Sequence, residues 1–355
     1  MVPSLPLARR ETTLTSQLGL GDRVFASGKD KRFAADVDAG LELVEQGLRE
    51  QVRFADELAD VTARYLLNAG GKRVRPMLTL ITAQLGEGAT SEVIDAAQAV
   101  EITHLASLYH DDVMDEAQTR RGVPSAQHVW GNSVAVLTGD LLFARASQLV
   151  AGLGEGAIRL QSDTFERLCL GQLHETIGPH EGDDPVEHYI GVLADKTGSL
   201  IAAAAQMGVM FSGAPEEYIR PVMEFGEKVG VGFQLIDDVI DLSGKGAETG
   251  KTPGTDLRAG VATLPLLKLR ELASTGDARA AALLDRLDTE VLGAPDTKDV
   301  SEVVTALREH PVTQETLDEA HRWAHEAVQA IAPLPQGSVK RALTRFADTI
   351  VERSS

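Results

Sequence analysis

The helical pattern of apolar residues constrains the fold of this chain more than any other feature of its sequence. The pattern runs almost without interruption from Asp36 to Glu352, and alanine and leucine fill most of its apolar positions. Aromatic residues make up only 4% of the chain, so the large side chains that favour strands are scarce. The sequence therefore predicts an all-α fold in which helices pack on helices.

Domain organisation follows from the same pattern. Hydrophobic residues make up 43% of the 355 residues, which is enough for a large buried core. Residues 1–35 contain proline, glycine and mixed charges without periodicity, and we expect a loosely ordered lead-in there. Length alone would allow two further domains, but the continuous pattern predicts one large domain over residues 36–355.

Charge and cysteine content limit the partners and the compartment. The formal net charge is −19, which argues against binding nucleic acid or an anionic membrane surface. The single cysteine, Cys169, excludes an internal disulfide, fits a reducing cytoplasm, and is expected to pack as a small hydrophobic residue. The N-terminal residues lack the pattern of a signal peptide. The weakly polar run Ser199–Ala214 is too short to span a bilayer, so we predict a buried helix and no transmembrane segment.

Two clusters of aspartates share the spacing D-D-x-x-D. They are Asp111, Asp112 and Asp115 in the first cluster, and Asp237, Asp238 and Asp241 in the second. On a helix the carboxylates at i and i+4 lie on one face, and the group at i+1 lies about 100° round from them. Carboxylates held this close need a cation between them, and Mg²⁺ is usually held by one or two carboxylates together with water and phosphate oxygens.

A solvated acidic helix end is the simpler explanation of one such cluster. Two observations argue against it here. Each cluster follows an apolar run, "ITHLASLY" or "VGFQLI", so each should lie at the mouth of a core, and the spacing occurs twice. Cations also stand at helix ends and loops of this acidic chain: Lys72, Arg75, Arg120, Arg121, Lys196 and Lys251. Such side chains near Mg²⁺ are a common means of binding a diphosphate.

With these motifs in place, the sequence resembles the all-trans isoprenyl diphosphate synthases, the polyprenyl synthetase family, of the medium- or long-chain type. The resemblance covers about residues 36 to 350, and the matching motifs occur in the family's order: "GGKRVRP", "DDVMD" with "RRG", "GDLLFARA", "GQ", "DKTGSL", "FQLIDDVID" and "GKTPGTDL". It implies a single large helical bundle around a central cavity, the isoprenoid synthase type I fold, commonly as a homodimer. It also implies Mg²⁺, with Mn²⁺ as an alternative, and two substrates, isopentenyl diphosphate and an allylic prenyl diphosphate.

The resemblance also implies roles for individual residues. The residues matched to isopentenyl diphosphate binding are Lys72, Arg75, His104 and Arg121. Those matched to the metal are Asp111, Asp112, Asp115, Asp237, Asp238 and Asp241. Those matched to the allylic diphosphate are Arg120, Lys196, Thr197, Gln234 and Lys251. The implied catalytic residues are the first five of these aspartates and Lys196. The implied reaction ionises the allylic diphosphate, adds the alkene of isopentenyl diphosphate, and passes the lost proton to the departing diphosphate.

One position departs from the family. Many members carry a lysine in a "GK-x-T" element after the second cluster, and here "AGVATLP" places Val261 there. Either Lys251 and its neighbours are sufficient for binding phosphate, or binding is weaker at this point.

Small residues in front of the first cluster bear on product length. Ala106, Thr103, Ala99 and Ala96 recur at helical spacing, over about 15 Å of helix that starts about 7.5 Å below Asp111. Many short-chain members have a bulky residue at the position of Ala106. We therefore expect a medium or long product of about C30 to C50, a quinone side-chain precursor, with Ala106, Thr103 and Phe143 as chain-length residues. One alternative is that the small residues only let a neighbouring helix pack closely. A second is that the enzyme is a short-chain (C15 to C20) synthase.

Three other classes of protein remain as alternatives. A class I terpene cyclase would share metal and helices, but it usually has an aromatic-lined cavity and seldom a second intact cluster. A non-catalytic subunit of a heteromeric synthase typically lacks one or both clusters. A metal-dependent phosphohydrolase would be expected to use histidine ligands, and none of the nine histidines has that spacing here.

Overall fold

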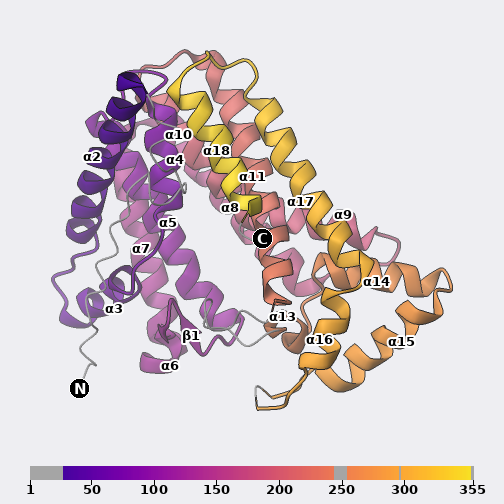
Figure 1. Cartoon of the computed structure of the whole chain (residues 1–355). Coiled ribbons are helices and arrows are strands. Elements are labelled where there is room, and N and C mark those ends of the chain that lie inside the picture. Colours follow the sequence, from indigo (N-terminus) through magenta and orange to yellow (C-terminus); the bar gives the residue numbers. More distant parts are fainter. Residues whose placement is uncertain (1–26, 244–253, 296, 353–355) are drawn as a thin grey trace. The chain divides into compact units, whose positions relative to one another are not determined.

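The computed structural model describes residues 27–243, 254–295 and 297–352. Within these ranges the chain is helical except for turns, connecting segments and one pair of two-residue strands (Figure 1). The strands β1 (Thr119–Arg120) and β2 (Val123–Pro124) pair antiparallel. The all-α prediction is confirmed.

The contacts within the chain divide it into two compact units. Unit 1 comprises Met1–Glu166, Leu200–Gly226 and Ile331–Arg345, and unit 2 comprises Arg167–Ser199, Glu227–Ala330 and Phe346–Ser355. Three helices, α8, α11 and α18, run from one unit into the other. The first aspartate cluster lies in unit 1 and the second in unit 2.

The helices of unit 1 are mostly consecutive in the sequence. They are α2 (Gly28–Gln51), α3 (Glu57–Asn68), α4 (Val74–Ala83), α5 (Ser91–Met114), α6 (Ala126–Trp130), α7 (Asn132–Leu153), α10 (Ser199–Phe211) and the short 3-10 helix η2 (Glu216–Tyr218), with the first turns of α8 (Glu155–Ile177), α11 (Ile219–Asp241) and α18 (Ser338–Glu352).

Unit 2 contains the remaining helices. They are α9 (Pro185–Leu193), the π-helix η1 (Ala194–Gly198), α13 (Thr255–Ala259), α14 (Leu264–Ser274), α15 (Ala278–Arg286), the π-helix η3 (Leu287–Val291), α16 (Ser301–Arg308) and α17 (Pro311–Ala330). Here α14 packs against α9, α15 and α17. Leucine and valine side chains from α13 to α17 form its apolar core.

Helix α5 is the central helix of unit 1 and carries the first cluster at its end. It packs against α2, α4 and α7 (Figure 1). Every residue from Ala96 to Thr103 is buried, so no side of the helix faces water there. The helix is capped by Thr90, whose hydroxyl accepts a hydrogen bond from the backbone N–H of Val93 at 3.1 Å.

The alanine-rich run that the sequence predicted as a buried helix is α10, and this prediction is confirmed. It packs on α4, where Thr79 and Thr82 donate hydrogen bonds to the carbonyls of Ala204 and Ala205, both at 2.9 Å. Gly208 allows this approach because a Cβ there would lie 2.1 Å from the Thr82 hydroxyl oxygen.

Two expectations from the sequence differ from the structure. Helix α2 begins at Gly28, inside the predicted lead-in, because Ser27 caps it and Phe33 and Ala34 are already buried. Cys169 does not pack as a buried hydrophobic residue; it is exposed on α8.

Helix α7 is the one helix in the described ranges that is long and apolar enough to cross a membrane by length and composition. In this structure 33% of its most apolar stretch is buried. The core helix of a globular protein passes the same test, so a single helix of this kind is weak evidence for a membrane span.

Candidate active site

The first aspartate cluster closes α5 at its C-terminal end. Asp111 is half-buried, Asp112 is completely buried, and Asp115 is the exposed C-cap, whose backbone N–H donates to the Asp111 carbonyl at 2.8 Å. Asp112 therefore points into the protein, while Asp111 and Asp115 are accessible to solvent at the end of the helix. This agrees with the sequence expectation that the cluster lies at the mouth of a core.

Asp112 is held by a cation from the β1 strand. Arg120 Nε donates to its Oδ1 at 2.6 Å, and its buried Oδ2 accepts no hydrogen bond from the described residues. Burial raises the pKa of the Asp112 carboxyl, and the Arg120 guanidinium offsets part of that rise. A buried carboxylate oxygen without a donor is a suitable ligand for a cation.

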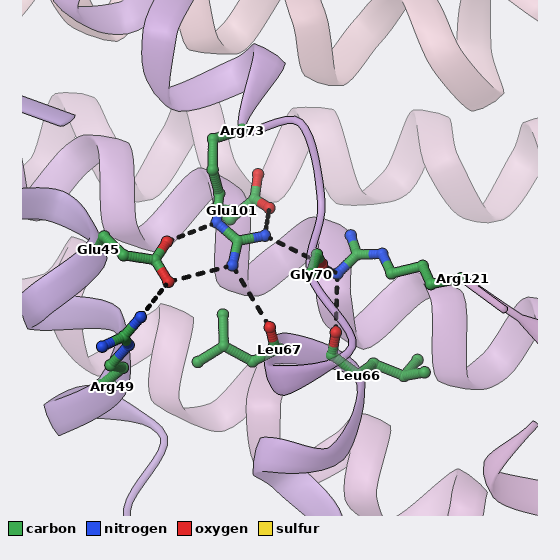
Figure 2. Close-up of polar contacts among 8 residues, drawn as sticks. All are labelled: Glu45, Arg49, Leu66, Leu67, Gly70, Arg73, Glu101 and Arg121. Carbon is green, nitrogen blue, oxygen red and sulfur yellow. Dashed lines mark hydrogen bonds and ion pairs between the residues drawn. The ribbon is translucent and has the colours of Figure 1, made fainter. Parts of the chain in front are cut away.

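Cationic groups gather beside this cluster in unit 1. Arg121 adopts a left-handed backbone conformation with φ 54°, and its Nη1 donates to the carbonyls of Leu66, at 2.9 Å, and Gly70 (Figure 2). The Arg75 guanidinium makes no hydrogen bond to the described residues, and its Nε is buried. Burial lowers the pKa of Arg75 to about 10, although the nearby Glu101 carboxylate opposes the shift.

His104 belongs to the same group of residues. Its pKa lies well below its usual value, first because burial disfavours the charged ring and then because Arg75 and Arg121 repel a further positive charge. Three of the four residues predicted to bind isopentenyl diphosphate are thus electrostatic neighbours. The fourth, Lys72, is exposed on the loop that leads into α4.

The second aspartate cluster closes α11 in unit 2. The Tyr189 hydroxyl of α9 hydrogen-bonds both carboxylate oxygens of Asp238, at 2.9 and 2.8 Å, and the backbone N–H of Leu264 donates to Oδ2 at 3.4 Å. Asp238 is 6% exposed, and burial raises the pKa of its carboxyl well above the usual value. Asp237 is half-buried, and Asp241 accepts a hydrogen bond from the backbone N–H of Asp256.

The first four residues of the "DKTGSL" motif lie in the π-helix η1, a rare conformation that is frequent at functional sites. Lys196 of this segment forms an ion pair with Glu175 of α8. Gly171 of the "GQ" motif lets α8 approach, because a Cβ there would lie 2.7 Å from the Lys196 backbone nitrogen. Thr197 is half-buried on the same segment.

Arg167 fixes the position of η1 within unit 2. Its Nε donates to Asp195 at 2.7 Å and its Nη1 to Glu227 of α11 at 2.6 Å. Gln234, one turn before the second cluster, is half-buried. Val261, at the position where many family members have lysine, is 37% exposed.

The small residues along α5 are all buried, and two of them contact neighbouring helices. Thr103 accepts a hydrogen bond from Gln161 of α8 at 3.0 Å. Ala99 forms an apolar cluster with Val150 of α7 and Ala157 of α8. At this level the helices touch, as expected if the small residues serve close packing.

Phe143, the third predicted chain-length residue, lies on α7. Its ring lies 5.6 Å from that of His110 and 4.5 Å from that of Phe165. His110 immediately precedes Asp111, so Phe143 is level with the first cluster along α5 rather than with Thr103. This position gives no support to a role at the floor of a product tunnel.

The remaining predicted site residue, Lys251, falls outside the described residues. Among the described residues, no three histidine, cysteine, aspartate or glutamate side chains gather closely enough to hold a metal by themselves. Carboxylate oxygens are nevertheless the donors that Mg²⁺ prefers, and it commonly takes only one or two of them besides water and phosphate. Within unit 1, the buried Asp112 Oδ2, which accepts no hydrogen bond from the described residues, is a donor that fits an ion bound together with a diphosphate.

Sequence reasoning missed four residues that shape these sites. They are Arg73, Glu101, Arg167 and Tyr189. Arg73 stands inside the "GGKRVRP" motif, but nothing in the motif separates its role from that of Arg75. The other three make contacts between segments far apart in the sequence, which no local spacing reveals.

Comparison with known proteins gives a consistent result. The sequence profile of the family described as Polyprenyl synthetase matches residues 56–305. The chain is 44% identical over 346 residues to nonaprenyl diphosphate synthase of Mycobacterium tuberculosis, covering 97% of this chain and 99% of that protein. It is 34% identical to octaprenyl diphosphate synthase of Haemophilus influenzae, covering 89% and 95% of the two chains.

Solved structures agree with the sequence comparison. A polyprenyl synthase from Caulobacter crescentus, complexed with calcium and isoprenyl diphosphate, matches with a TM-score of 0.80 at 30% identity and covers 93% of this chain and 99% of that one. A geranylgeranyl pyrophosphate synthase from Corynebacterium glutamicum, also complexed with calcium and isoprenyl diphosphate, matches with a TM-score of 0.79 at 40% identity, with the same coverage. The fold is therefore that of the isoprenoid synthases.

Proposed function

Because this chain belongs to the polyprenyl synthetase family and is a trans-prenyltransferase, we propose that it joins isopentenyl diphosphate to an allylic prenyl diphosphate and makes a product of about C30 to C50. The observation that carries the proposal is the family match over residues 56–305, with both D-D-x-x-D clusters complete. The intact clusters also argue against a non-catalytic subunit, and the scarcity of aromatic residues argues against a cyclase.

The proposed reaction uses the two helix ends as follows. Each aspartate cluster would hold Mg²⁺ together with diphosphate oxygens, and the metal would stabilise the negative charge that leaves with the allylic diphosphate. Arg120 contacts that leaving group while Asp112 fixes its guanidinium, at 2.6 Å. Lys196 and Lys251 are the other proposed contacts, with Thr197 and Gln234 as positioning groups.

The isopentenyl substrate is proposed to bind through Lys72, Arg75, His104 and Arg121. Arg75 and Arg121 have guanidinium nitrogens that donate to none of the described residues, so they can donate to a diphosphate. A neutral His104, as its lowered pKa implies, keeps one N–H donor and adds no repulsion to the arginines. The carbon–oxygen bond of the allylic diphosphate breaks first, the alkene then attacks the allylic carbocation, and the proton lost goes to the departing diphosphate.

The proposed product length rests on Ala106 and on the relatives. Ala106 is completely buried five positions before Asp111, and its side chain is the smallest that leaves α5 intact. Relatives of both classes match well, from the nonaprenyl synthase to the geranylgeranyl synthase of Corynebacterium. Ala99 contacts α7 and α8, and Thr103 contacts α8. For a long product to pass this level of α5, we propose that α7 and α8 move away from it.

A variant tests the product length directly. Ala106→Phe should shorten the product, because the ring fills the space beside α5 that a growing chain needs. Ala106→Ser is the matched control, since it changes the same buried position without adding a ring and should leave the product length unchanged. If Ala106→Phe folds and makes the same product as the wild type, the small-residue argument fails.

We also propose a homodimer. Helix α7 and the first part of α8 expose an unusual number of large apolar side chains: Val136, Leu137, Leu141, Ile158 and Phe165, each between 38% and 60% exposed. Large apolar patches of this kind commonly mark an interface. Sedimentation of the purified chain tests this, and a monomer at micromolar concentration would contradict it. The single cysteine agrees with the cytoplasm as the proposed compartment.

The activity itself is tested with purified protein. It is incubated with isopentenyl diphosphate, Mg²⁺ and either farnesyl or geranylgeranyl diphosphate, and the lipid products are separated by chromatography. We expect elongated linear products that disappear when the metal is chelated. Asp111→Asn should abolish them, while Glu116→Gln, an exposed acid just beyond the cluster, should not. Cyclic hydrocarbons would indicate a cyclase instead.

A further inference from the structure

Arg73 occupies an unusual position at the start of α4, next to the residues proposed to bind isopentenyl diphosphate. It is the N-cap residue of the helix, but its backbone is left-handed with φ 50°, and its side chain does not cap the helix. Such a conformation costs about 1 kcal/mol or more for a residue with a Cβ, so other contacts have to stabilise it. Its side chain turns back into the protein and is only 5% exposed.

Every donor of the Arg73 guanidinium is used inside the protein (Figure 2). Nε and Nη2 donate to the two carboxylate oxygens of Glu45, at 2.8 and 3.4 Å. Nη1 donates to Glu101 at 3.2 Å and to the Gly70 carbonyl at 3.3 Å. Nη2 also reaches the Leu67 carbonyl at 3.5 Å. A guanidinium has five N–H donors and five contacts are present, so none remains for a phosphate oxygen.

The partners of Arg73 come from three other helices. Glu45 belongs to α2, Leu67 to the last turn of α3, and Glu101 to the central helix α5. Glu101 is only 2% exposed, and a carboxylate buried this deeply needs a paired cation. Arg73 therefore balances a buried charge and fixes the loop between α3 and α4 at the same time.

Arg75 and Arg121 differ from Arg73 because some of their guanidinium N–H donors make no hydrogen bond to the described residues. Only Nη1 of Arg121 donates hydrogen bonds to the described residues. One of its two acceptors is the Gly70 carbonyl, which also accepts from Arg73. The loop closes tightly over both guanidinium groups. A Cβ on Gly71 would lie 2.5 Å from Arg73 Nη1 and 3.0 Å from Arg121 Cζ.

We propose that Arg73 is a positioning residue for the isopentenyl diphosphate subsite: it binds no substrate, but holds the Gly70 carbonyl and the loop so that Lys72, Arg75 and Arg121 present their donors in one direction. This inference rests on the proposed function. It assigns different tasks to the two arginines of the "GGKRVRP" motif. Arg73, whose donors are all used, holds the loop, and Arg75, whose donors are available, binds the diphosphate.

The Arg73→Lys variant tests this. Lysine keeps the positive charge beside Glu101 but cannot reproduce the planar fork, so the carbonyls of Gly70 and Leu67 lose their donors. We expect KM for isopentenyl diphosphate to rise about tenfold, while KM for the allylic substrate changes by less than about twofold. Equal rises in both constants, or an unchanged KM for isopentenyl diphosphate in a folded variant, would overturn the proposal.

Two further variants separate positioning from general stability. Arg49→Gln removes the exposed partner of Glu45, which contacts it at 3.3 Å, and should leave both KM values unchanged. Glu45→Gln keeps the shape of the acceptor and loses its charge; it should raise KM for isopentenyl diphosphate in the same direction but less, and it serves if Arg73→Lys does not fold. Wild-type protein without synthase activity would refute the proposed function, whereas an active wild type with insensitive variants would refute only the role of Arg73.

Discussion

The two aspartate clusters have identical spacing, but the protein buries their middle carboxylates in different ways. Asp112 in unit 1 is paired with a cation, the guanidinium of Arg120, at 2.6 Å. Asp238 in unit 2 is held by neutral donors, the hydroxyl of Tyr189 and the backbone N–H of Leu264. Burial raises the pKa of both carboxyls, and for Asp238 the pKa rises well above the usual value, where the nearby negative charges of Asp256 and Asp237 add to the effect of burial.

Within each cluster, the middle aspartate holds a neighbouring segment of the chain, and the first aspartate is only half-buried. In unit 1 only the middle aspartate is buried, and it contacts the β1 strand through Arg120. In unit 2 both Asp238 and Asp241 are buried, and Asp238 contacts helix α9 through Tyr189. An ion pair makes Asp112 dependent on a residue that is itself a proposed substrate contact. Within the described part of the chain, Asp238 is contacted by neutral donors.

The largest expected effect comes from removing the ion pair between Arg120 and Asp112. Arg120→Gln removes a proposed contact of the leaving diphosphate and also leaves the buried Asp112 without its cation. We expect kcat/KM to fall by about 10³-fold, as when a donor to a developing negative charge is lost. Steady-state kinetics with the allylic substrate measures this.

Arg120→Lys is the informative companion to that variant. It keeps a charge near Asp112 but not the guanidinium geometry, so it should recover part of the activity. Wild-type kinetics in the glutamine variant would mean that Arg120 does not contact the leaving group.

The sequence predicted this arrangement only in part. Helical spacing correctly indicated that Asp112 and Asp238 lie round the helix from their partners, and the apolar runs indicated that each cluster borders a core. Spacing does not tell which side is buried, because the partner that permits burial is far away in sequence: Tyr189 stands 49 residues before Asp238. The same reason hid the roles of Arg73 and Glu101.

Removing the hydrogen bonds between Tyr189 and Asp238 is expected to have a smaller effect on activity. Tyr189→Phe removes the hydroxyl from both oxygens of Asp238 without changing the packing of the ring. The free energy of unfolding should fall by about 1 to 2 kcal/mol. The Mg²⁺ concentration for half-maximal activity should rise about tenfold if Asp238 binds the metal as proposed, because a residue that orients a metal ligand affects metal affinity.

A matched control for this variant is Tyr218→Phe. Tyr218 lies on the short helix η2, is half-buried, and its hydroxyl has no hydrogen bond to the described residues. This control should leave both stability and metal dependence unchanged. If Tyr189→Phe loses stability but keeps the wild-type Mg²⁺ dependence, its anchor is structural only.

The smallest effect, in the absence of divalent metal, concerns stability alone and has the opposite sign. A carboxyl whose pKa is raised on folding destabilises the folded state as pH rises above its unfolded value, near 3.8. Asp238→Asn removes that penalty, so with chelator at pH 7 its melting temperature should exceed that of the wild type by about 1 to 4 °C, and the gain should vanish near pH 4. Asp112→Asn should gain less, because Arg120 already offsets part of the cost of burying Asp112. Thermal unfolding of both variants at the two pH values measures the contrast, and equal gains would show that Arg120 does not compensate the charge of Asp112.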